Sequence, residues 1–206
     1  MGWEPDRYLQ FSDERLQPAA DLLHRVPLAR PARIVDLGCG AGNVTRLLAR
    51  RWPEADITGL DSSPGMLERA RSVLPSVRFE LAGVECWEPD ESLDLLFSNA
   101  ALHWVDGHEA LFPRLLDSLS PGGVLAVQMP GNFDAPSHRL IRELASSTTW
   151  AESIGLKRMG AVLPMADYQR ILAPRCTRLH LWETTYWQAM SGPAPVLDWL
   201  RGTTLI

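Results

Sequence analysis

The chain has 206 residues, 46% of them apolar, and a formal net charge of −5. That length accommodates one sizeable α/β domain and leaves too little chain for two full ones. The negative charge argues against a broad phosphate-binding surface, so we expect no nucleic-acid partner. Lys157 is the only lysine; the resulting arginine bias suits anionic ligands, although a biased genomic composition alone produces it.

Cysteine usage and the N-terminus indicate the compartment. Cys39, Cys86 and Cys176 are an odd number and widely spaced, which predicts reduced thiols of a cytosolic protein. The N-terminal residues MGWEPDRY contain no signal-peptide core, and Asp6 stands where a myristoylation motif has Ser or Thr. No apolar run approaches membrane-spanning length. We therefore expect a soluble, cytoplasmic protein without a membrane partner.

The N-terminal part shows helical spacing and no strand pattern. Tyr8, Phe11 and Arg15 recur at that spacing, and 22–23 can extend it. Pro18 is interpreted as the start of a new helix, because proline is favoured in the first helical turn. We treat residues 1–30 as a helical cap.

Strands and helices then alternate. Residues 33–37 read as a short buried strand, followed by a helix that ends before Pro53. A second strand covers 55–61, and Ser63 is the expected N-cap of the next helix, with a proline at its first position.

The alternation continues with strands over 77–83, 92–100 and 123–130 and a helix over 108–119. Such alternation predicts a parallel sheet covered on both faces, in a Rossmann-like, doubly wound α/β arrangement. We expect residues 31–130 to form the cofactor-binding core.

The pattern weakens after the fifth strand. Residues 137–148 read as a helix, 149–175 mix Gly and Pro with short apolar pieces, 178–190 read as a strand and 194–202 as a final helix. No repeat or linker separates this stretch, so 131–206 is expected to complete a single domain of 1–206 with cap elements.

The glycine loop in VDLGCGAGNVTRLL indicates the ligand. Gly38, Gly40 and Gly42 follow the first strand at alternate positions, and Asn43 fills the place of the third glycine of a dinucleotide fingerprint. No lysine follows, which excludes a phosphate-cradling NTPase loop. Asp36 in that crevice repels a pyrophosphate and attracts a ligand carrying an ammonium and a sulfonium, such as S-adenosylmethionine.

Four motifs, VDLGCGAGNVT, LDSSPGML, LDLLFSNAALHWV and LSPGGVLAVQMP, resemble successive motifs of class I S-adenosylmethionine-dependent methyltransferases. The chain is most similar to the trans-aconitate 2-methyltransferase family, through WEPDRYLQFSDERLQPA, VQMP with Asn132, WETTYWQAM and DWLRGT. The resemblance runs from Trp3 to about Gly202. It implies an enzyme that uses S-adenosylmethionine and forms a methyl ester on a carboxylate of trans-aconitate or a similar small polycarboxylate.

The resemblance also implies cofactor contacts. Gly38 and Gly40 would let the backbone approach the methionine part, with Asp36 as a second support, and Asn99 would bind the methionine tail. Around the nucleoside, the implied residues are Asp61 on the ribose hydroxyls, Ser62 as a polar contact and Met66 beside the ribose and adenine. The alternative is that Asp61 and Ser62 only cap a helix and that Met66 belongs to the core.

One position departs from the family pattern. Gly83 stands where the family usually has an Asp that accepts from the adenine amino group. Val84 and Glu85 follow in the segment expected to flank the adenine, and Glu85 can replace the missing acceptor. Without a replacement, cofactor binding would lose on the order of 1 kcal/mol.

A carboxylate acceptor requires no catalytic base, because it is already ionised at pH 7. It does require positive charge and polar donors. We nominate Arg15 and Tyr8 on one helical face, Gln128 and Asn132 at the end of the fifth strand, and Trp104 as an apolar wall. The alternatives are a surface ion pair for Arg15 and simple packing for Trp104.

Other function classes remain open at this point. They are a methyltransferase of another small molecule, a nucleotide-binding oxidoreductase, and a cofactor-binding protein without turnover. No histidine or cysteine spacing indicates a metal site, and no G-x-S-x-G elbow is present. The oligomeric state is not indicated.

The C-terminus departs from the family fold, which finishes with a seventh, antiparallel strand. No apolar run after the helix around Trp199 supplies that strand, so the fifth strand and 178–190 are expected to have open edges. We expect a shortened form that binds cofactor but turns over acceptor poorly.

Overall fold

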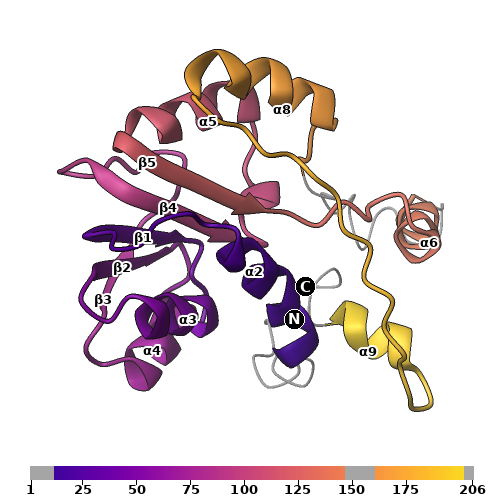
Figure 1. Ribbon diagram of the computed structural model, residues 1–206. Coiled ribbons are helices and arrows are strands. Elements are labelled where there is room, and N and C mark those ends of the chain that lie inside the picture. The colour runs from indigo at the N-terminus through magenta and orange to yellow at the C-terminus, as the bar shows by residue number, and fades with distance from the viewer. Residues whose placement is uncertain (1–11, 147–160, 202–206) are drawn as a thin grey trace.

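The computed structural model describes residues 12–146 and 161–201, built around a five-stranded parallel sheet (Figure 1). The strand order is β3-β2-β1-β4-β5, which confirms the predicted doubly wound arrangement. The order reverses between β1 and β4, and sheets of this kind bind ligands outside the strand ends at that point. The strands are β1 (Arg33–Leu37), β2 (Asp56–Asp61), β3 (Arg78–Leu81), β4 (Leu93–Asn99) and β5 (Leu119–Gln128).

Helices cover both faces of the sheet. On one face α2 (Ser12–His24) and α3 (Asn43–Arg51) pack over Ile34 and Phe97. On the other, α5 (His108–Asp117) and α8 (Met165–Leu172) pack over Val35 and Leu37. The alternate directions of β1 side chains therefore feed two apolar layers. The remaining elements are α4 (Pro64–Val73), η1 (Leu102–Trp104), α6 (Pro136–Ala145), η2 (Ala173–Arg175) and α9 (Pro195–Arg201).

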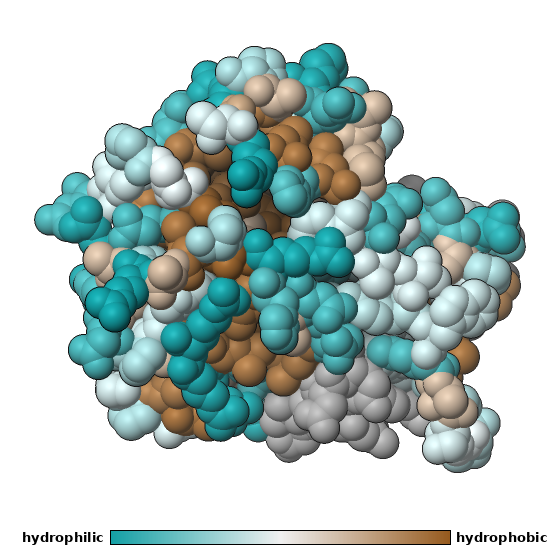
Figure 2. Space-filling model, in the orientation of Figure 1, coloured by the Kyte–Doolittle hydropathy of each residue, from teal (hydrophilic) through white to brown (hydrophobic). Residues whose placement is uncertain are grey.

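Most of the helix and strand boundaries that the sequence predicted lie within a few residues of the observed ones. Ser63 is the N-cap of α4, and its hydroxyl accepts from the Met66 N–H at 3.4 Å. β5 begins earlier than predicted, at Leu119, because Leu93 pairs with Leu119 before an irregularity in the β4–β5 register. β5 forms an edge of the described sheet with mostly half-buried side chains, and Figure 2 shows apolar surface in this region.

The interpretation of Pro18 as a helix start was wrong. α2 is continuous from Ser12 to His24, with Pro18 inside it. Proline removes one backbone hydrogen bond from a helix interior. The apolar face of α2, with Ala19 and Leu22 almost fully buried, packs in the same cluster as Val44 of α3. This packing stabilises the helix across the proline.

The predicted strand over 178–190 is also absent. Residues 176–194, the strap, run from η2 to α9 without strand pairing in the described chain (Figure 1). The strap is held by side chains: the guanidinium of Arg25 lies 4.3 Å from the Trp182 ring, and the Tyr186 hydroxyl donates to Asp21 at 2.7 Å. Alternating apolar residues thus reflect packing on helices rather than a β ladder.

α8 was not predicted, because it lies in the stretch interpreted as short apolar pieces. α6 and α9 match the helices predicted near them. Within 12–146 and 161–201, no helix is both long and apolar enough to cross a membrane.

Candidate functional site

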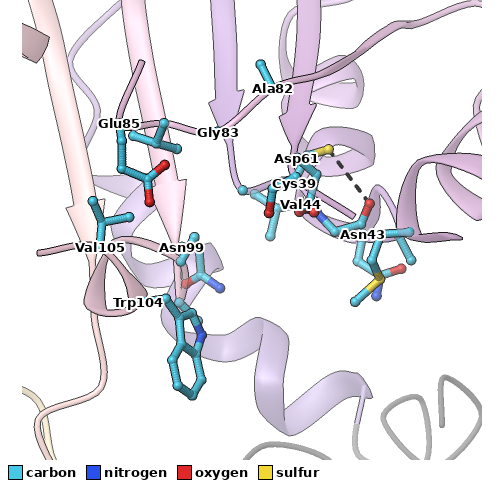
Figure 3. A pocket seen from close by; sticks show the side chains of 18 of the residues that line it. Cys39, Asn43, Val44, Asp61, Ala82, Gly83, Glu85, Asn99, Trp104 and Val105 are labelled. Atoms are coloured by element: carbon cyan, nitrogen blue, oxygen red, sulfur yellow. Dashed lines mark hydrogen bonds between the residues drawn. The ribbon is translucent and has the colours of Figure 1, made fainter. Parts of the chain in front are cut away.

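A cavity of about 400 Å³ opens at the carboxyl ends of the strands. Its wall comes from the segments that follow β1, β2, β3 and β4, and from α2 through Leu16. Figure 3 shows Glu85, Asn99 and Trp104 on one side of the cavity, facing Asp61 and Asn43 on the other. The cavity therefore lies at the topological switch point of the sheet.

The structure brings most of the predicted site residues to this cavity. Those on its wall are Gly38, Gly40, Asp61, Ser62, Met66, Val84, Glu85, Asn99 and Trp104. Their part in binding stays a prediction, but three of the four methyltransferase-like motifs and the segment after β3 converge on one space.

The loop after β1 requires glycine at its first turn. Gly38 has φ +71°, and a Cβ built there would lie 2.2 Å from the Cβ of Ala101. A side chain at position 38 would therefore collide with the segment that follows β4. The close approach of these two segments shapes the floor of the cavity.

Asp61 ties the glycine loop to the start of α4. One carboxylate oxygen accepts from the Gly40 N–H at 2.9 Å, and the other accepts from the Ser63 N–H at 2.8 Å. A helix-capping role accounts for the second bond but not for the first. Each oxygen keeps acceptor capacity for a ligand hydroxyl.

The end of β4 holds an unpaired acceptor and a strained backbone. The Asn99 side-chain oxygen is buried without a hydrogen-bond partner among the described residues. The next residue, Ala100, has φ +51°, a left-handed conformation that is uncommon outside glycine. Its N–H donates to the Gln128 carbonyl at 3.0 Å. Strain and unmet hydrogen bonding together are typical of binding sites.

Glu85 occupies the space beside Gly83. A Cβ at position 83 would lie 2.8 Å from a carboxylate oxygen of Glu85. Arg114 of α5 braces the segment, since its guanidinium donates to the carbonyls of Val84 and Trp87, both at 2.5 Å. The Glu85 carboxylate therefore lies next to the place that a side chain at position 83 would take.

Asp36 does not lie on the cavity wall, unlike its expected position in the crevice. The side chain is 1% exposed and accepts from the Thr45 hydroxyl at 2.6 Å. Burial raises the pKa of Asp36 to about 7, against the Thr45 hydrogen bond and with a smaller contribution from the charge of Asp61. The Asp36 carboxyl group therefore contacts Thr45 of α3 and does not reach the cavity wall.

The residues predicted to bind the acceptor are less completely placed. Tyr8 lies outside the described residues, as does the side chain of Arg15, although Leu16 brings the first turns of α2 to the cavity. Gln128 pairs with Asn99 in the sheet register, but neither Gln128 nor Asn132 is on the cavity wall. Trp104 is on that wall and 47% exposed, so it does not simply pack under the following helix.

Several wall residues were missed by sequence reasoning. Asn43 and Val44 lie inside the glycine motif and could have been found there. Leu16 and Ala101 also lie inside quoted motifs, but no pattern there marks them as wall residues, because only tertiary packing brings them to the cavity. Cys39 is also on the wall; it is buried, and burial, with the nearby charges of Asp36 and Asp61, raises the pKa of its thiol. The described residues contain no cluster suited to a metal ion.

Comparisons with known proteins point the same way as the site. A family model described as a methyltransferase domain matches residues 34–123. A trans-aconitate 2-methyltransferase of Variovorax paradoxus (strain S110) is 48% identical over 208 residues, covering 100% of this chain and 80% of that protein. One from Streptomyces coelicolor is 52% identical over 214 residues, covering 98% of this chain and 70% of that protein.

Two solved structures extend the likeness to the fold. An S-adenosylmethionine-dependent methyltransferase from Mesorhizobium loti has a TM-score of 0.50 and 35% identity, over 58% of this chain and 55% of that one. A putative methyltransferase bound to the Haloferax volcanii Trm112 activator has a TM-score of 0.63 and 22% identity, over 83% of this chain and 72% of that one. The second likeness concerns the fold alone.

Proposed function

Because the chain belongs to the trans-aconitate 2-methyltransferase family, we propose that it methylates a carboxylate of trans-aconitate or a similar small polycarboxylate. It is an S-adenosylmethionine-dependent methyltransferase. The supporting observation is the identity of 46–52% to relatives of that name over nearly the whole chain. The proposed reaction gives a methyl ester in the cytoplasm.

The residues on the cavity wall fit the cofactor. S-adenosylmethionine supplies a methyl group on a cationic sulfonium. The unpaired oxygen of Asn99 offers an acceptor to its ammonium group, and the free acceptor capacity of Asp61 suits the ribose hydroxyls. A Cβ at Gly40 would meet only the end of Met66, at 4.0 Å, so the loop leaves room for a ligand there. We propose that Glu85 accepts from the adenine amino group.

The acceptor side needs positioning rather than proton transfer. A carboxylate with a pKa near 4 is ionised at pH 7, so the protein has no proton to remove. The chain's task is to align a carboxylate oxygen with the methyl group and to exclude water. We propose Trp104 as the apolar wall, Arg15 and Tyr8 as the groups that bind the carboxylates, and Gln128 and Asn132 as outer polar contacts.

The cofactor assignment is tested by Asp61→Ala with Asp94→Ala as its control. Asp94 also accepts from two backbone N–H groups, those of Ala32 and Arg33, at the opposite end of the sheet. We expect Asp61→Ala to weaken S-adenosylhomocysteine binding by roughly 1–3 kcal/mol, and Asp94→Ala to leave it unchanged. Calorimetric titration measures both, with NAD as the comparison ligand. Equal affinities in the two variants would contradict the ribose assignment.

The adenine assignment has its own test in the pair Glu85 and Gly83. Glu85→Ala should weaken S-adenosylhomocysteine binding about fivefold to tenfold, the value of one hydrogen bond. Adding Gly83→Asp to that variant should restore the affinity, because the vacated space then holds the family's carboxylate. An affinity that is unchanged by Glu85→Ala would show that another group accepts from the adenine.

Acceptor identity is tested by a methyl-transfer screen over di- and tricarboxylates, with detection of the ester product. We expect trans-aconitate to give the highest kcat/KM. Arg15→Ala should raise the KM for trans-aconitate at least tenfold while the cofactor KM stays constant, since only the acceptor is polyanionic. Arg50→Ala, on the exposed side of α3, is the control. Ester formation on other acceptors only would contradict the trans-aconitate assignment.

A further inference from the structure

The short helix η1, which carries Trp104 to the cavity, is held from outside at two points. The Ala161 N–H donates to the carbonyl of His103 at 2.7 Å. The Nε2 of His108 lies 2.9 Å from the carbonyl of Leu102. Both contacts fix the backbone of η1 rather than its side chains.

The second contact continues as a chain of hydrogen bonds through His108 to Tyr168. A carbonyl only accepts, so the Nε2 of His108 carries the proton that it donates to Leu102. In the neutral ring Nδ1 is then the acceptor, and the Tyr168 hydroxyl donates to it at 2.6 Å. The Tyr168 oxygen accepts in turn from the Leu163 N–H at 3.2 Å. Every polar side-chain atom of His108 and Tyr168 thus has a hydrogen-bond partner.

The side chains that form these hydrogen bonds are almost completely buried. His108 is 2% exposed and Tyr168 7%, and Phe112 packs on both rings at 5.2 and 5.1 Å between ring centroids. An unpaired polar group in such surroundings loses its solvation without compensation. The links are therefore strongly favoured, and they join α8 to η1 through α5.

The segment that leads from β4 into η1 contains a strained residue. Ala100 holds a left-handed conformation just before η1, and Trp104 and Val105 from its end line the cavity. Of the proposed cofactor contacts, Gly40, Asp61 and Glu85 come from other segments, while Asn99 belongs to the end of β4, before the strained residue Ala100. A shift of η1 would therefore move the acceptor side of the cavity more than the cofactor side.

We propose that His108 and Tyr168 are positioning residues for Trp104, through which the C-terminal part of the chain sets the acceptor side of the cavity. The proposal rests on the proposed function, because it concerns the acceptor of that same site. Neither side chain touches the cavity.

Two substitutions at position 108 separate the links of the chain. In His108→Gln the amide reaches the place of Nε2 and can still donate to the Leu102 carbonyl. In His108→Asn it reaches only the place of Nδ1, so the bond to Tyr168 can remain while the bond to Leu102 is lost. We expect His108→Asn to raise the KM for trans-aconitate about tenfold or more, and His108→Gln less than about threefold. Binding of S-adenosylhomocysteine should change less than about threefold in both.

Hydrogen exchange followed by mass spectrometry supplies a readout that needs no acceptor. The peptide covering 100–107 should exchange fastest in His108→Asn, which loses the bond to Leu102, and only slightly faster than the unmodified protein in His108→Gln and Tyr168→Phe, which keep that bond and lose only the bond between positions 108 and 168. Leu172→Val is the control, because it loosens the buried packing of α8 without touching the chain. It should lower the melting midpoint without changing that exchange or the trans-aconitate KM.

The outcomes distinguish the two proposals. If the unmodified protein does not methylate trans-aconitate, the proposed substrate is wrong, and the exchange pattern still decides the positioning role. Equal exchange and equal KM in His108→Asn and His108→Gln would overturn the positioning role. An equal rise of KM in Leu172→Val would overturn it as well, since it would reduce the effect to loss of stability.

Discussion

The cofactor-facing half of the chain and its C-terminal part are held together by different interactions. In residues 33–128 a ladder of parallel backbone hydrogen bonds joins five strands. Residues 161–201 are joined to elements far away in the sequence by side-chain contacts of the helices and the strap, together with the backbone bond from Ala161 to His103. The strand ends of residues 33–128 form the edge at which the cavity opens, and we propose that residues 161–201 position its acceptor side.

The same contrast appears within the cavity wall. On the cofactor side, single residues define the shape through backbone geometry, as Gly38 and Asp61 do. On the acceptor side, Trp104 depends on support relayed through α5 and α8. Substitutions in residues 33–128 should therefore cause large losses of stability and cofactor binding close to the changed residue. Substitutions in residues 161–201 should cause small effects, or effects on the cavity from a distance.

The largest expected effect comes from Gly38→Ala, in the part of the protein that the strand ladder joins. Gly38 and Gly107 have nearly equal φ, +71° and +69°, but a Cβ at Gly107 would meet nothing within 4 Å. Gly107→Ala therefore measures the conformational strain alone, about 1–2 kcal/mol. Gly38→Ala adds the collision with Ala101 and should lose about 1–3 kcal/mol more, as overpacking does.

Urea unfolding of both variants measures this difference, and titration with S-adenosylhomocysteine follows the site. Gly38→Ala should also abolish measurable cofactor binding, whereas Gly107→Ala should leave it intact. Equal losses of stability in the two variants would mean that the segment after β4 moves easily to accommodate the added methyl group, and the close approach at Gly38 would then not constrain the loop.

Sequence reasoning succeeded where a pattern and its partner are close along the chain. The glycine loop, the Ser63 cap and the five strands are of this kind, since each follows from periodicity or from a turn residue. It failed where distant packing decides the conformation. Pro18 is tolerated because α2 is buried against α3, and the alternating residues of the strap pack on helices instead of pairing in a sheet.

Within the site the division is similar. Motif positions such as Gly40 and Asn99 reach the cavity, as expected, because strand ends place them there. The inward position of Asp36 was not expected, because a sequence does not show which way a side chain turns at the end of a strand. The support of η1 by Tyr168 has no local signal at all.

An intermediate effect is expected from Asp36→Asn, which keeps an acceptor for the Thr45 hydroxyl but removes the charge. With its pKa raised from 3.8 to about 7, folded Asp36 keeps its proton over a range in which the unfolded carboxyl has lost it. Its contribution to stability therefore falls as pH rises from about 4 to about 7. Compared with the unmodified protein, Asp36→Asn should raise the free energy of unfolding by on the order of 2 kcal/mol more at pH 8 than at pH 5.

The measured quantity is the difference in free energy of unfolding between Asp36→Asn and the unmodified protein at each pH. Burial lowers the pKa of His103 to about 4, so that histidine removes stability as pH falls from about 6.5 to about 4. This opposite slope is common to both proteins and cancels in the difference. A difference that does not change with pH would show that folded Asp36 is ionised throughout.

The smallest effect is expected from Tyr186→Phe, which removes the hydroxyl that the strap donates to Asp21 of α2. Tyr168→Phe is its matched control, because it removes the same atom from an enclosed position where His108 loses its partner. The Tyr186 bond is exposed to solvent, which replaces it readily, whereas water cannot reach the Tyr168 bond without opening the core. Tyr186→Phe should therefore leave the melting midpoint within about 2 °C and the trans-aconitate KM unchanged, while Tyr168→Phe should shift both. A large loss of stability in Tyr186→Phe would show instead that the strap holds α2 against the sheet, and the C-terminal part would then support the cofactor side of the cavity as well as the acceptor side.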